Sequence, residues 1–284
     1  MKTIVYLLVS VLVVSFSPSL SERVSIFDAL NKRWIKCVVT ANDSFNEGQL
    51  SVLIENLHQL KNVVIPSGTR FISESSDEQD FMNVNDELIV LDGKSVEITI
   101  DGYCVQKHNS YPTEGNLFTL HKESNEKLVK TAQLMNQKGF SRNIIQSALW
   151  SVSDGATFSG IYEKNNEKVE ELRAAICALT GREDDWYNTD ATYELSETRQ
   201  IVSEVTKIEG LISYEVKETG SLKMEVCKSD GEVIRTLASS TPVQHLGEYR
   251  FNFNLKVQGW ERGSYSVRLK INNNVFHEQE FEVG

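Results

Sequence analysis

From Thr206 to the last residue, apolar and polar side chains alternate, and this pattern restricts the fold more than any other feature. Alternation at every second residue places the apolar side chains on one face of a β-strand. Turn residues such as Ser229-Asp230-Gly231 separate the runs, and no helical pattern interrupts them. About six or seven short strands in this length predict an all-β immunoglobulin-like sandwich over residues 206–284.

Residues 22–185 have a mixed pattern. β-rich runs separated by turn residues are followed by segments with apolar residues at helical spacing. We therefore expect an α+β domain here, in which a β-sandwich carries an inserted helical block, so that the whole chain is mainly β. The polar stretch 186–205 is predicted to be a linker. Strands are predicted at Trp34–Thr40, Gln49–Glu55 and Val96–Asp101, and helices at Glu126–Gln137, Ser141–Ser151 and Lys168–Leu179.

The first 21 residues have the pattern of a secretory signal peptide. Lys2 precedes the apolar run Ile4–Phe16, and the small residues of Ser17–Ser21 suit a cleavage site. A membrane anchor is the alternative, but the run is shorter than the roughly 20 residues that span a bilayer. We expect an exported protein at the cell surface, in the extracellular space or in the periplasm, without a transmembrane anchor after cleavage.

Charge and motifs narrow the function classes. The chain has 40 acidic and 29 basic residues, a net charge of -11, which disfavours a nucleic-acid partner. It contains no zinc-protease, phosphate-loop or serine-hydrolase motif. The sequence therefore predicts no metal site, no cofactor and no set of catalytic residues. The five histidines lack metal-ligand spacing: His58, His108, His121, His245 and His277.

Four cysteines have different surroundings in the sequence. Cys37 and Cys177 lie on apolar faces and are predicted to be buried, whereas Cys227 is predicted to be partly exposed. Cys104 ends a strand and opens a polar loop. In an exported protein we expect disulfides, and four cysteines allow three pairings among which the sequence does not choose.

Three motifs resemble the thioester domains of bacterial surface adhesins: Tyr103-Cys104-Val105, then Tyr111-Pro112-Thr113-Glu114-Gly115, then Gln146-Ser147-Ala148-Leu149-Trp150. The resemblance implies that the Cys104 thiol and the Gln146 side chain condense to an internal thioester, which captures an amine of a partner. It also implies that Tyr103 and Trp150 shield the bond from water. Two positions depart from the family, since Ile145 stands where it has threonine and Leu149 where it has isoleucine.

The C-terminal part resembles the immunoglobulin-like domains of flagellar hook-cap proteins and the C-terminal sorting domains of type IX secretion substrates. The resemblance rests on the alternating strands and on Gly247-Glu248-Tyr249 and Gly263-Ser264-Tyr265. It implies a spacer or a secretion signal.

The main functional hypothesis is an exported surface or adhesion-type binding protein, and not an enzyme, with a protein or glycan surface as its partner. Trp186, Tyr187 and Tyr193 form a second predicted contact region, because aromatic side chains suit such surfaces, and a packed linker is the alternative for them. Two other functions stay open. One is an exported enzyme with a carboxylate pair like that of glycoside hydrolases, and the other is a purely structural envelope protein.

Overall fold

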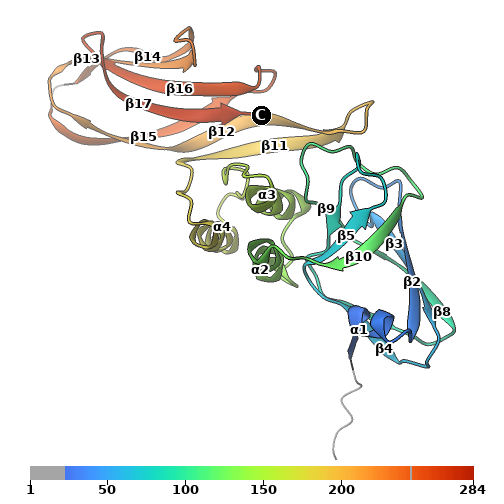
Figure 1. Ribbon diagram of the computed structural model, residues 1–284. Coiled ribbons are helices and arrows are strands. Elements are labelled where there is room, and N and C mark those ends of the chain that lie inside the picture. The colour runs from blue at the N-terminus through green and yellow to red at the C-terminus, as the bar shows by residue number, and fades with distance from the viewer. Residues whose placement is uncertain (1–22, 244) are drawn as a thin grey trace, which may run out of the picture.

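The computed structural model describes residues 23–243 and 245–284 and confirms a mainly β chain with a helical block (Figure 1). The predicted signal peptide at 1–21 lies outside the described residues. None of the helices in the described part is long and apolar enough to cross a membrane. We call residues 23–185 the head, and the strands that follow the C-terminal sheet pair.

The head contains two β-sheets that share one apolar core with α1 (Ile26–Asn31). The larger sheet has seven strands, and all six neighbouring pairs are antiparallel. The predicted strands correspond to its β2, β3 and β8. The larger sheet has the order β8 (Ser95–Ile100), β3 (Leu50–Asn56), β2 (Ile35–Ala41), β10 (Leu117–Lys122), β5 (Thr69–Ser73), β6 (Phe81–Met82), β9 (Tyr103–Cys104), and the smaller has β1 (Val24–Ser25), β4 (Asn62–Ile65), β7 (Glu87–Val90).

The helical block consists of α2 (Glu126–Met135), α3 (Arg142–Ser153) and α4 (Glu167–Thr180), close to the predicted bounds. Their buried side chains form a second core together with residues of β6 and β9. In Figure 1 the three helices lie beside the larger sheet and beneath β11. Helix α3 also contributes to the core of the head sheets, in which its Trp150 packs.

Helix α2 has a side-chain N-cap and helix α3 has none, so the contribution of the cap to stability can be tested. The Asn125 side chain accepts hydrogen bonds from the backbone N–H groups of Lys127 and Leu128. Ser141 occupies the predicted N-cap position of α3 but makes no side-chain capping bond. Asn125→Ala is expected to lower the free energy of unfolding by about 1 kcal/mol. Urea unfolding of Asn125→Ala and of the matched Ser141→Ala variant would test this, and equal losses would contradict it.

The C-terminal sheet pair consists of two antiparallel sheets around a third core. This region is all β, as predicted, and its assignment as immunoglobulin-like stays a prediction. One sheet has the order β11 (Tyr187–Leu195), β12 (Ile201–Val216), β15 (Gly247–Lys256), and the other β14 (Val233–Val243), β13 (Gly220–Lys228), β16 (Gly263–Ile271), β17 (Asn274–Val283).

The segment predicted as a linker, 186–205, is instead strand β11 and the start of β12. The prediction was wrong because polar residues on the exposed face of a strand look like a loop in the sequence. Arg173 fixes the passage from α4 to β11. Its guanidinium donates to Asp184 Oδ1 at 2.6 Å, to Asn188 Oδ1 at 2.5 Å and to the carbonyl of Asp185 at 2.8 Å.

Candidate functional site

The Gln146 side chain is hydrogen-bonded at both ends of its carboxamide to the backbone of Cys104. The Cys104 N–H donates to Gln146 Oε1 at 3.0 Å, and Gln146 Nε2 donates to the Cys104 carbonyl at 2.8 Å. Both residues are buried, with 1% and 7% of their surfaces exposed. The two bonds hold the carboxamide against the residue that carries the thiol. The structure thus brings together the two residues that the sequence motifs selected.

Strand β9 and helix α3 position this pair. Cys104 is the last residue of β9 and pairs with Phe81 of β6 at the end of the larger sheet. Helix α3 packs on β9, and Gln146 lies one turn after Arg142. The Arg142 guanidinium donates to the carbonyl of Gly102 at 3.1 Å, directly before β9. The first turn of the helix is therefore tied to the strand on which the cysteine lies.

A small pocket of about 50 Å³ opens beside the pair. Its volume suits one or a few water molecules. Trp150, the predicted shielding residue, lies in its wall and is 3% exposed. Two further aromatic residues contribute walls, Phe45 from the loop before β3, which sequence reasoning missed, and Tyr193 from β11, which was predicted as part of a separate contact region. The Tyr193 ring meets the Trp150 ring edge-on, with centroids 5.8 Å apart.

Burial raises the pKa of the Cys104 thiol far above its ordinary value, and the nearby positive charge of Arg142 only partly opposes this shift. Burial likewise raises the pKa of Tyr111, whose hydroxyl donates to the Ser44 carbonyl at 2.6 Å. Cysteine hydrolases depend on a lowered thiol pKa, commonly through a histidine partner. Among the described residues that line the Cys104 pocket, none is a histidine.

Tyr103 does not take the shielding position that the resemblance implied. Neighbouring residues of a strand point to opposite faces. Tyr103 therefore packs in the core of the helical block, whereas Cys104 packs in the core of the head sheets. The Arg142 guanidinium lies 4.8 Å from the centre of the Tyr103 ring. Tyr103 supports the position of Arg142 and does not cover the cysteine.

The second predicted contact region is divided between two cores. Tyr187 is 4% exposed in the core of the C-terminal sheet pair, so it offers no surface to a ligand. Trp186 is half-buried beside it and donates from Nε1 to the carbonyl of Glu280 at 2.5 Å. Tyr193 alone of the three reaches the Cys104 pocket.

All four cysteines lie in the described part of the chain, and all four are free, so the expected disulfides are absent. Cys37 and Cys177 are half-buried against apolar cores, less enclosed than predicted. Cys227 is fully buried, and the prediction of partial exposure was wrong. The reason is that charged side chains cover the outer face of β13, where Arg268 lies against Cys227. Burial raises the pKa of Cys37 to about 12.

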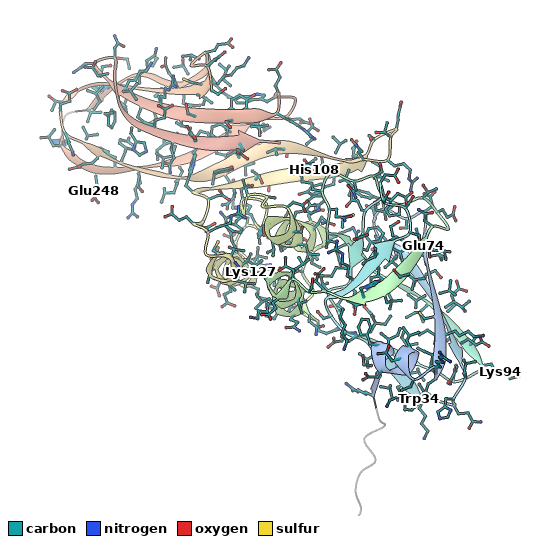
Figure 2. The ribbon with its side chains drawn as sticks, viewed as in Figure 1. Trp34, Glu74, Lys94, His108, Lys127 and Glu248 are labelled. Carbon is teal, nitrogen blue, oxygen red and sulfur yellow. The ribbon has the colours of Figure 1, made fainter. Side chains whose placement is uncertain are left out.

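A wider cleft of about 650 Å³ lies between the head and the C-terminal sheet pair. Lys107, His108 and Arg262 line it together with Glu282, and it shares Ile201 with the Cys104 pocket. Figure 2 shows His108 at this junction, beside the β11–β12 hairpin. Within residues 23–243 and 245–284, no group of three or more histidine, cysteine, aspartate or glutamate side chains is placed to hold a metal ion.

Comparison with known proteins adds no assignment. No family model matches the chain, and no curated protein does. One solved structure, a calcium-binding mutant of Bacteroides uniformis beta-glucuronidase 2, aligns with 86% of this chain at 9% identity and a TM-score of 0.22. The chain spans 27% of the length of that protein. A likeness this low carries no argument about fold or activity.

Proposed function

We propose that Cys104 and Gln146 form an internal thioester through which the protein attaches covalently to an amine on its partner. The pair of hydrogen bonds between the Gln146 carboxamide and the Cys104 backbone carries this proposal. In this function the protein is an exported adhesion-type protein. Its head binds the partner, and its C-terminal sheet pair serves as a spacer.

The thioester forms by exchange of one bond for another. The Cys104 sulfur attacks the carboxamide carbon of Gln146, the carbon–nitrogen bond breaks, and ammonia leaves with the thiol proton. The negative charge of the intermediate develops on Gln146 Oε1, which already accepts the Cys104 N–H. A backbone donor fixed in a buried site stabilises such charge more than bulk water does. No oxidant, metal or nucleotide is consumed.

Capture of the partner is the second exchange. The neutral amine of a lysine side chain attacks the thioester carbon, the carbon–sulfur bond breaks, and Cys104 leaves as a thiol after taking up the amine proton. The product is an isopeptide bond between Gln146 and the partner. Burial next to Trp150 supports the proposal, since water that reached the bond first would hydrolyse it.

The raised pKa of Cys104 favours this function over that of a cysteine hydrolase. A hydrolase needs a thiolate ready in the resting enzyme, whereas a thioester stores the acyl group without one. The partner is a protein or glycan surface that carries a primary amine. The alternatives of a glycosidase-like enzyme and of a structural envelope protein have no observation of this kind in their favour.

Intact mass of the full chain purified in amine-free buffer tests the proposal. We expect a mass one ammonia below that of the reduced chain, and an adduct of one methylamine after incubation with that amine. Cys104→Ala should have its full mass and bind no methylamine, whereas the matched Cys37→Ala variant should behave as wild type. Full reduced mass of the wild-type chain, with a free thiol at Cys104, would refute the thioester.

A further inference from the structure

The β11–β12 hairpin extends beyond the sheet to which it belongs. Strand β12 pairs with β15 only from Lys207 to Val216, whereas Ile201–Val205 pair with β11 alone. The outer half of the hairpin therefore projects from the C-terminal sheet pair and reaches over the head near β9 (Figure 1). Its apolar residues Tyr193, Leu195 and Ile201 pack on the core of the head.

This projecting half closes the Cys104 pocket. Tyr193 and Ile201 are two of its walls, and the Tyr193 hydroxyl lies 3.3 Å from Ser147 Oγ, one residue after Gln146. The pocket of about 50 Å³ has room for water but not for a lysine side chain of a folded partner. An acceptor can reach Gln146 only if a wall of the pocket moves, and the hairpin is one of these walls. Ile201 is also part of the wall of the 650 Å³ cleft, so moving the hairpin joins the two spaces.

Arg199 at the turn of the hairpin ties it to the head. Its Nη2 donates to the Pro112 carbonyl at 2.7 Å and its Nε to the Tyr111 carbonyl at 3.2 Å. Its own carbonyl accepts the Tyr111 N–H at 2.6 Å, and its Nη1 lies 3.5 Å from Asp43 Oδ1. These contacts join the tip of the hairpin to the segment that runs from Cys104 to β10 and to Asp43 in the loop after β2.

The backbone at Arg199 has a φ of 57°, the left-handed conformation that favours glycine. An arginine here costs conformational energy that glycine would avoid. Strained residues of this kind persist only where surrounding contacts hold them, and they cluster at functional sites.

We propose that the β11–β12 hairpin is the removable cover of the Cys104–Gln146 site and that Arg199 is its latch. That opening admits the amine of a partner rests on the proposed function. That the hairpin moves does not depend on it. Arg199 is a positioning residue, since it acts through Tyr193 and Ile201. Because β12 continues into the C-terminal sheet pair, a partner that displaces this pair would also open the site.

The test measures how fast iodoacetamide alkylates Cys104 in the full-length Gln146→Glu variant, in which Cys104 is a free thiol whether or not the wild-type chain forms a thioester. Arg199→Gly removes the latch and relaxes the turn. We expect it to raise the alkylation rate of Cys104 by at least about tenfold, since it removes hydrogen bonds from a charged donor. Arg199→Lys should restore part of the protection, and Arg235→Ala, an exposed arginine of β14, should change nothing.

Peptide mass spectrometry separates the four cysteines and supplies the internal control. Cys227 is fully buried beneath charged side chains on the outer face of β13 and should stay as protected as before. An unchanged Cys104 rate in Arg199→Gly would overturn the latch. Equal increases at Cys104 and Cys227 would also overturn it, because they would mean general loosening. Failure of the thioester itself would appear in the wild-type mass and would leave this measurement unaffected.

Discussion

Gln146→Asn is expected to abolish amine capture completely, although it keeps the carboxamide group. Asparagine is shorter by one methylene, so its amide cannot keep both bonds to the Cys104 backbone that now measure 3.0 and 2.8 Å. The carboxamide carbon then lies farther from the Cys104 sulfur that must attack it. The rate of such a reaction falls steeply when the reacting atoms are slightly misplaced. Intact mass should show the full reduced mass and no methylamine adduct.

The matched control is Gln133→Asn, the same shortening at an exposed glutamine of α2, which should leave the missing ammonia and the adduct as in wild type. Circular dichroism should show that both variants fold, although Gln146→Asn leaves buried backbone groups of Cys104 less well satisfied and is expected to lose about 1–3 kcal/mol of stability. A Gln146→Asn chain that still lacks one ammonia would contradict the assignment of the acyl donor.

Arg70→Met is expected to have the largest effect on stability, about 3–5 kcal/mol, because it leaves two enclosed carboxylates without their cation. Arg70 lies on β5 and donates to Asp80 at 2.7 and 3.0 Å and to Glu123 at 2.8 Å. The two carboxylates are 9% and 4% exposed. Urea unfolding measures the loss. Replacing both carboxylates as well, by Asp80→Asn and Glu123→Gln, should recover much of it, and no recovery would contradict the ion-pair explanation.

The loss caused by Arg70→Met should depend on pH. Burial raises the pKa of Glu123, but the backbone N–H of Asn125 and the Arg70 guanidinium outweigh it, so the pKa is lowered on balance. A carboxyl group with a lowered pKa in the folded state stabilises the fold above its unfolded pKa, about 4.3, and loses this contribution as the pH falls through the folded value. The difference between wild type and Arg70→Met should therefore be largest near neutral pH and shrink below about pH 4.

The sequence predicted the elements whose pattern is local. The period of two at β2 and β8, the β-rich run at β3 and the helical spacing of α2–α4 depend only on neighbours along the chain, and the structure confirms these elements. The pairing of Cys104 with Gln146 came from a motif resemblance. Its geometry depends on β9 and α3 meeting across the larger sheet, which no local pattern records.

The wrong predictions arise because the sequence does not show which elements or side chains cover each face of a strand. Cys227 lies beneath charged side chains on the outer face of β13, so it is buried where alternation alone predicts partial exposure. Tyr103 lies beneath a helix on the face of β9 opposite Cys104, which the motif resemblance did not indicate. Tyr193 was assigned to a contact region in a linker, although it is a wall of the Cys104 pocket. No signal in the sequence indicated that a strand of the C-terminal sheets would extend onto the head.

The hairpin contains a bulge at which the pairing of Asp190 with Lys207 changes to that of Ala191 with Val205. Because side chains alternate between faces, the extra residue decides which side chains of β12 point to the head and which to the C-terminal core. Gain or loss of a single residue between Ile201 and Ile208 would exchange the two faces and turn Ile201 away from the head. Natural variation in chain length should therefore accumulate in the turns of the outer strands and be selected against in this stretch, where the count of residues matters more than their identity.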